Sequence, residues 1–220
     1  MWWKILMGLL ITFVVISVFL MPPPQKELGD ISRIFFFHVP VAWVTVLAFL
    51  VAMVNSILYL SRKDPVYDLQ AAISSQLGFL FAILATVSGA IFAKNAWGSY
   101  WNWDPRETSV FILLLIYGAY LALRSAIEAE DRKANLSAVY SILAFITVPF
   151  LVFVVPRVFQ SLHPTDSIVN SQIKIQMPPL VLLVFLSSLL GFSLLFVWIY
   201  NLEIKVTILH KKIKGSLTIK

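Results

Sequence analysis

Six long apolar segments constrain the fold of this chain more than any other feature of its sequence. A helix needs about 20 predominantly apolar residues to cross the hydrocarbon core of a bilayer. Segments of this kind occupy approximately residues 5–21, 39–60, 71–93, 109–127, 136–155 and 178–200. The connections between them are short. The sequence therefore predicts an all-α integral membrane protein, a bundle of six transmembrane helices that forms a single domain over residues 1–220.

The composition fits a membrane protein and excludes several classes of function. Hydrophobic residues make up 60% of the chain and charged residues 13%, whereas about a quarter of the residues are charged in soluble domains. The chain has no cysteine, which excludes thiolate-bound zinc, iron–sulfur clusters and thiol chemistry. The net charge of +6 lies mainly between apolar segments, so it points to membrane orientation rather than to nucleic acid.

The basic residues predict the orientation of the bundle. They are concentrated near Lys4, in the connections at 61–64 and 124–133, and after Tyr200. By the positive-inside rule these parts face the cytoplasm, so both termini are predicted to be cytoplasmic. Three loops then face outward, at 22–38, 94–108 and 156–177. Three prolines follow the first apolar segment where a small-residue cleavage site would be needed, so we expect it to remain as a membrane anchor.

The middle outer loop, between the third and fourth spans, is unusually rich in large aromatic residues. It contains Trp97, Gly98, Tyr100, Trp101 and Trp103, and then Asp104 and Arg106. Trp and Tyr beside a membrane span often act as interfacial anchors. The spacing W-G-x-x-W-x-W-D favours an aromatic platform for a flat conjugated ligand, because an anchor requires neither a glycine nor a fixed spacing. Asp104 and Pro105 also fit a helix start, as N-cap and first helical residue.

Two of the three histidines lie on the predicted outer side. His38 is at the outer mouth of the second span and His163 is in the last outer loop, so they flank the aromatic loop. Neutral imidazole is a good ligand for heme iron, and two such rings can fill both axial positions. A lone interfacial histidine is more often solvated than ligating, whereas two beside this loop favour ligation. His210 lies among the lysines of the tail, where we expect it to be solvated.

Charged residues on the outer side add candidate partners for a ligand's carboxylates, which a guanidinium suits best. These candidates are Arg33, Arg106, Arg157 and Lys174. Arg106 can equally be a helix-start charge. No histidine or charged residue lies in the middle of a predicted span, which argues against transmembrane electron transfer and proton-coupled transport.

These motifs resemble those of the heme exporter protein C (CcmC) family of cytochrome c maturation. His38-Val39-Pro40-x-Ala42-Trp43 is similar to the family's first histidine motif, and the tryptophan-rich signature is matched by Trp97, Gly98, Trp101, Trp103 and Asp104. The resemblance implies that His38 and His163 are axial ligands of a transiently bound heme b. It also implies that the aromatic loop, with Tyr100, Arg106 and Trp43, holds the porphyrin.

The resemblance further implies a location and partners. Members of this family lie in the bacterial or archaeal cytoplasmic (inner) membrane, with functional loops on the periplasmic side. They work with the ABC-transporter subunits CcmA and CcmB and the small membrane protein CcmD, and they load heme onto the heme chaperone CcmE. The expected protein is a heme-transfer component rather than an enzyme, with the lipid bilayer as surroundings and no nucleic acid as partner.

Two alternatives stay open at this point. The larger CcsA and CcmF synthetases, which attach heme directly to apocytochrome c, share the tryptophan-rich signature, so a cytochrome c heme synthetase is the first alternative. The second is a purely structural membrane subunit whose aromatic residues serve as anchors, and it predicts no bound heme.

Overall fold

The six predicted spans are confirmed in the computed structural model, which describes residues 2–163, 177–213 and 215. Six helical segments are long and apolar enough to cross a membrane: Trp2–Leu20, Asp30–Arg62, Pro65–Trp97, Pro105–Ala126, Glu130–Val158 and Pro179–Ile213. Within the described residues there is no β-strand, and an isolated bridge joins Gln25 to Gly29. The protein is therefore all-α, as the apolar segments predict.

The helices are α1 (Trp2–Leu20), α2 (Phe35–Arg62), α3 (Pro65–Trp97), α4 (Pro105–Ala126), α5 (Glu130–Pro149), α6 (Val155–Val158) and α7 (Pro179–Ile213). A 3-10 turn, η1 (Asp30–Ile34), leads into α2, and a π-helical segment, η2 (Phe150–Val154), joins α5 to α6. Most helices extend beyond their apolar segments. The extension places His38 inside α2, Trp97 at the end of α3 and His210 in the last turns of α7, rather than in loops or a tail.

Local capping explains where some of these helices begin and end. The Asp64 carboxylate accepts a hydrogen bond from the Val66 N–H at 2.9 Å, and Pro65 is the first residue of α3. A proline fits there because the first N–H groups of a helix have no partner within it. Gly98, with φ at +84°, ends α3 in the left-handed conformation that favours glycine.

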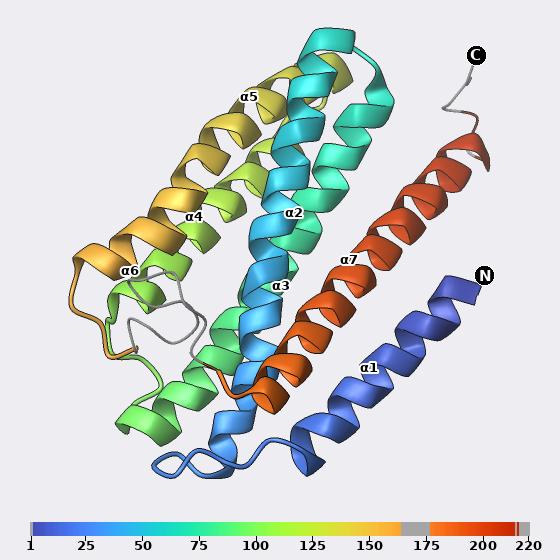
Figure 1. Ribbon diagram of the computed structural model, residues 1–220. Helices are drawn as coiled ribbons and strands as arrows, with labels where there is room; N and C mark the ends of the chain where they lie inside the picture. The colour runs from blue at the N-terminus through green and yellow to red at the C-terminus, as the bar shows by residue number, and fades with distance from the viewer. Residues whose placement is uncertain (1, 164–176, 214, 216–220) are drawn as a thin grey trace.

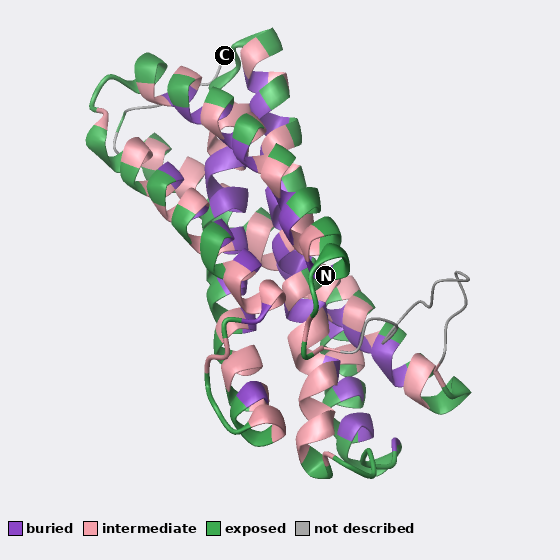
Figure 2. Cartoon of the chain, turned by 90° about the vertical axis from the view of Figure 1, so that its left-hand side faces the viewer, coloured by how far each residue is buried: buried purple, intermediate pink, exposed green. Residues whose placement is uncertain are grey.

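The helices form a central group with two helices beside it (Figure 1). Helices α2 and α3 pack against each other along their length, α4 and α5 lie on one side, and α7 lies on the other, with α1 packed against α7. The connection between α3 and α4 lies at one end of the molecule, and both termini point toward the other end (Figure 1). Buried residues are concentrated where the helices face each other, while outer faces are largely exposed (Figure 2).

Small residues allow close packing in the central group. Ala48 and Ala52 of α2 and Gly78 of α3 lie in its interior. Small side chains let helix backbones approach, and in a membrane such packing replaces much of the hydrophobic drive. The ring of Phe49 lies over Gly78 and stacks on Tyr117 of α4, with ring centroids 3.4 Å apart. This contact joins three helices at one point.

Pro40 leaves a backbone carbonyl of α2 without its usual partner, and α7 supplies one. A proline has no N–H, so it cannot donate to the carbonyl four residues earlier. Here that carbonyl belongs to Phe36, and it accepts a hydrogen bond from the Ser188 hydroxyl. The first turns of α2 are thereby connected to α7.

A half-buried ion pair lies toward the opposite end of the molecule from the α3–α4 connection. Arg124 of α4 donates two hydrogen bonds to the Asp68 carboxylate of α3, at 2.6 and 2.9 Å. A two-pronged pair of this kind is strong and fixed in geometry. It holds α3 and α4 together where the sequence predicts the cytoplasmic side.

We expect Gly78→Ala to destabilise the protein. The added Cβ would lie 2.5 Å from Cε1 of Phe49, a fully buried ring that Tyr117 holds from its other face. Overpacking of this kind costs about 1–3 kcal/mol. The measurement is the unfolding transition in detergent micelles. Gly118→Ala is the matched control, because its Cβ would meet Phe79 at an ordinary 3.7 Å; equal stability of the two variants would contradict the expectation.

Candidate functional site

The carboxylate of Asp104 connects two segments that are far apart in the sequence. It caps α4 by accepting a hydrogen bond from the Arg106 N–H at 2.9 Å. It also accepts hydrogen bonds from the Leu162 N–H at 2.6 Å and the Ser161 hydroxyl at 2.9 Å, and Nδ1 of His163 lies 3.1 Å away. Because Asp104 is only 4% exposed, these bonds form largely out of water. They place His163 beside the start of α4.

Both ionisable groups of this contact have shifted pKa values. Burial acts to raise the pKa of the Asp104 carboxyl, but hydrogen bonds from the two backbone N–H groups and Ser161, together with His163, hold it below its ordinary value. Burial lowers the pKa of His163 below 6.5, although Asp104 opposes that effect. At neutral pH the carboxyl is therefore ionised and the imidazole is neutral. A neutral ring that donates its Nδ1–H to the carboxylate has a free lone pair on Nε2.

Trp97 packs against His163 at the end of α3. The centroids of these two rings are 4.7 Å apart, with an angle of 71° between the ring planes. Phe92 contacts the Trp97 ring edge-on, with ring centroids 5.6 Å apart. The left-handed turn at Gly98 directly after Trp97 leads the chain away from the helix axis. Trp97 therefore forms one wall around His163.

His38 approaches the same region from α2. Its Nδ1 lies 3.0 Å from the Ser88 hydroxyl of α3. That hydroxyl donates its hydrogen to the Leu84 carbonyl at 2.8 Å, so it accepts from the Nδ1–H of His38, and the lone pair of the neutral ring is on Nε2. The His38 ring also has a hydrogen bond with the backbone of Ala85. Gly89 permits this approach, because a Cβ at that position would lie 3.0 Å from Cε1 of His38. His38 and His163 are close enough to interact electrostatically.

Arg106 is one of two arginines in this region. It interacts electrostatically with Asp104 and Arg157 as well as with the two histidines. Its Nε is buried and has no hydrogen-bond partner among the described residues. A buried polar atom without a partner is costly, so a guanidinium placed this way is suited to receive an anion.

The other aromatic residues of the loop form a separate group. Trp101 meets Trp103 and Phe111 edge-on, with ring centroids 5.8 and 6.1 Å apart, and the three line an apolar pocket of about 180 Å³. Trp103 is 71% exposed and has φ at +56°. Positive φ is strained for a bulky residue and such strain is concentrated at functional sites. The predicted aromatic platform thus has two parts. One is Trp97 beside His163, and the other is the group of Trp101, Trp103 and Phe111.

Some predicted site residues lie apart from the histidines. Tyr100 is 61% exposed, with the Lys94 ammonium 5.6 Å from its ring centroid. Trp43 is 43% exposed on α2 and makes no ring contact with the cluster among the described residues. The Arg33 guanidinium forms an ion pair with the Asp30 carboxylate at 2.9 Å, and it donates hydrogen bonds to backbone carbonyls at and just after the end of α1. Lys174 lies outside the described residues.

Sequence reasoning missed the residues that orient the two histidines. Ser161 and Ser88 each contact a histidine ring, Gly89 makes room for His38, and Phe111 completes the outer aromatic group. Serine and glycine are common in helices and loops of any function. Ser161 stands two residues before His163, which is a local signal for a contact between them, but a serine at this spacing is not specific to any function.

The fold and the site define a multi-span membrane protein that gathers two histidines, a half-buried arginine and several tryptophans at one end of its helices. The chain belongs to the heme exporter protein C (CcmC) family, whose sequence model matches residues 1–218. This match confirms the family that the histidine and tryptophan motifs predict.

Individual relatives agree with this membership. Heme exporter protein C of Bradyrhizobium diazoefficiens is 30% identical over 197 residues, which are 88% of this chain and 73% of that protein. Heme exporter protein C of Paracoccus denitrificans is 34% identical over 150 residues, 68% of this chain and 62% of that protein. Cytochrome c biogenesis protein CcsA of Panax ginseng is 41% identical over a shorter stretch of 91 residues, 41% of this chain and 28% of that protein.

We expect Asp104→Ala to release the segment that carries His163. The substitution leaves the Leu162 N–H and the Ser161 hydroxyl without their acceptor, at a cost of about 1–3 kcal/mol for each group that stays buried. Hydrogen exchange at the Leu162 amide should become faster. Asp104→Asn should have a smaller effect, because asparagine is also a good N-cap and keeps one oxygen acceptor.

Glu107→Gln is the control for this experiment. Glu107 completes the capping box of α4 by accepting from the Asp104 N–H at 3.3 Å. The Glu107→Gln substitution changes the same helix start but leaves the acceptor of the Leu162 N–H in place. Unchanged exchange in Asp104→Ala, or equally fast exchange in Glu107→Gln, would show that Asp104 does not hold this segment.

Proposed function

We propose that this protein is a heme-binding component of cytochrome c maturation, which holds heme at the outer membrane face and passes it to another protein. The observation that carries this proposal is the pair His38 and His163, brought together from α2 and from the segment after α6, each with its Nδ1 hydrogen-bonded, which puts the lone pair of the neutral ring on Nε2. Family membership and the name of the relatives support heme as the ligand.

The donor set fits heme better than a bare metal ion. Among the described residues there is no cluster of three or more His, Cys, Asp or Glu side chains that could hold an ion alone. Two imidazoles are enough when a porphyrin supplies the other ligands of the iron. Heme b, which has no covalent link to its protein, is the form that a transfer component requires.

The surrounding residues have separate tasks in this proposal. Asp104 and Ser88 fix the ring orientation of His163 and His38, as outer hydrogen-bond partners of metal-binding histidines generally do. Arg106 offers its unpartnered Nε to a heme carboxylate. Trp97 stands beside His163 as an apolar wall for the ring system, and Trp101 and Trp103 extend that apolar surface outward.

The charge distribution supports an orientation in which both termini are cytoplasmic and residues 98–104 face the periplasm of a bacterial or archaeal cell. The protein then lies in the cytoplasmic membrane and presents heme outward. The partners in this proposal are the heme chaperone CcmE as acceptor, the ABC-transporter subunits CcmA and CcmB, and the small protein CcmD. Heme leaves unchanged, so the protein acts by transfer and not as an enzyme.

The test is the visible absorption spectrum of the purified protein with hemin, in oxidised and reduced forms. The parent should give a low-spin, six-coordinate spectrum. His38→Ala and His163→Ala should each change it and weaken hemin binding, because each removes one axial nitrogen. His210→Ala is the control, since that residue lies in the last turns of α7 at the far end of the bundle. A parent spectrum in both site variants would refute ligation by the pair.

A cytochrome c heme synthetase is the second candidate, and the stretch of 41% identity to CcsA favours it. The two functions differ in the product. A transfer component loads hemin onto a purified CcmE and forms no thioether with apocytochrome c. We expect that result when the reconstituted protein is mixed with each acceptor. Covalent heme on a Cys-x-x-Cys-His apoprotein without CcmE would establish the synthetase instead.

A further inference from the structure

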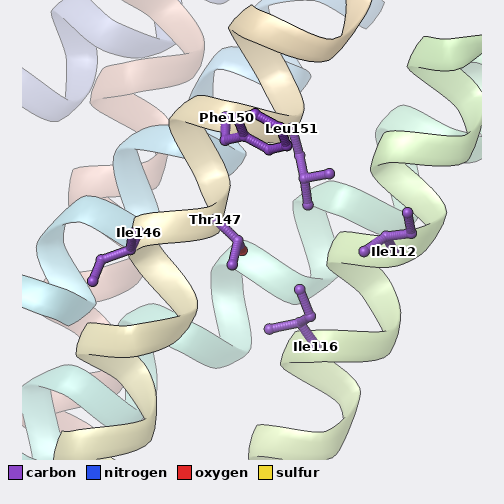
Figure 3. Close-up of a pocket in the computed structure, with 6 residues that line it drawn as sticks. All are labelled: Ile112, Ile116, Ile146, Thr147, Phe150 and Leu151. Atoms are coloured by element: carbon purple, nitrogen blue, oxygen red, sulfur yellow. The ribbon is translucent and has the colours of Figure 1, made fainter.

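An apolar groove of about 450 Å³ lies between α4 and the segment formed by α5 and η2 (Figure 3). Neither His38 nor His163 lines it. Its lining consists of Ile112, Ile116, Ile146, Thr147, Phe150 and Leu151. The Thr147 hydroxyl donates to the Ala144 carbonyl of its own helix at 2.7 Å, so it offers no free hydrogen to a ligand. The groove is therefore suited to an apolar surface.

The groove opens to the bilayer rather than to water. It lies on two helices that are long and apolar enough to cross a membrane, and its residues Ile146 and Phe150 are 63% and 55% exposed. Ile112 is seven residues after Pro105, which corresponds to about 10 Å along α4 at 1.5 Å per residue. The groove thus begins a short way below the loop end of α4, in the half of the membrane nearest the histidines.

A second apolar pocket, of about 180 Å³, lies toward the loop end of the same helix. It is lined by Phe111, the residue before Ile112, together with Trp101 and Trp103. On the α5 side, the groove ends at the start of the π-helical segment η2, which follows Pro149. π-helical turns are rare and frequently occur at functional sites. Two apolar hollows therefore lie on α4 between its middle and its loop end.

Two arginines lie at the loop end of the same seam. Arg106 is in the first turn of α4, and Arg157 is in α6, the short helix after η2. The two guanidinium groups interact electrostatically, and the Nε of Arg106 is buried without a partner among the described residues. Arg106 also interacts with the Asp104 carboxylate, and a further anion beside the two guanidinium groups would offset the repulsion between them. An apolar groove with two cations near its loop end matches an amphiphile with anionic groups along one edge.

We propose that this groove is the path by which heme enters the site laterally from the outer leaflet of the bilayer. Heme is a flat apolar ring with two carboxylates on one edge, so it lies in a membrane with those carboxylates at the surface. The inference rests on the proposed heme-binding function and adds the source of the ligand. A phospholipid has similar chemistry, and a groove that only holds lipid would leave heme uptake unaffected when it is filled.

The experiment measures the rate at which the full chain, reconstituted in phosphatidylcholine vesicles, takes up hemin that has been added to the membrane. Ile112→Trp and Ile146→Trp fill the groove from either side. We expect uptake, followed by the Soret band, to slow by about tenfold, which corresponds to a barrier about 1.4 kcal/mol higher. The final spectrum and the amount of hemin bound should stay as in the parent, because neither residue belongs to the histidine pair.

Leu115→Trp on α4 and Leu190→Trp on α7 are matched controls. Both leucines are similarly exposed, at 58% and 54%, and neither lines the groove. Parent rates in the controls and slow uptake in the groove variants support the path. Parent rates in the groove variants, or equal slowing in all four, overturn it. A parent protein that binds no hemin at all would instead refute the proposed function.

Discussion

The buried carboxylate of Asp104 is the interaction on which the rest of the site depends. It begins α4, holds the Leu162 N–H and the Ser161 hydroxyl, and orients the ring of His163. Because it is largely out of water, each of these bonds is stronger than it would be at an exposed position. The same carboxylate thus fixes local structure and the presentation of a candidate ligand atom. A residue that looks like an ordinary helix cap in the sequence has two tasks in the fold.

The sequence was sufficient to predict the fold and the end of the molecule where the site lies. Apolar segments of membrane length have few alternatives to helices, since every backbone group must be satisfied within the bilayer. The start of α4 at Pro105 also followed from local chemistry. The ends of the other helices were harder to predict, because they depend on polar residues that hydropathy does not count. Examples are the turn η1 before Phe35 and the continuation of α7 to Ile213.

The contacts within the site were beyond sequence reasoning for a different reason. Asp104 and His163 are 59 positions apart, and His38 and Ser88 are 50 apart. The residue types alone do not say which serine meets which histidine. The tryptophans illustrate the same limit, because one motif supplies two environments. Trp97 packs beside His163, while Trp101 and Trp103 form a separate group with Phe111, a residue that lies inside the next helix.

The hydrogen bond between Ser188 and the Phe36 carbonyl has a mechanical consequence. His38 is two residues after Phe36, so its position follows α2 and, through Ser188, α7. His163 is held by Asp104, whose place is set by α3 and α4. The two imidazoles therefore share α3 as a support, through Ser88 and Trp97, while α7 adds an attachment on the His38 side. A change in the tilt of α7 would thus reach α2 through Phe36, whereas the hydrogen bonds described for Asp104 are made with residues outside α7.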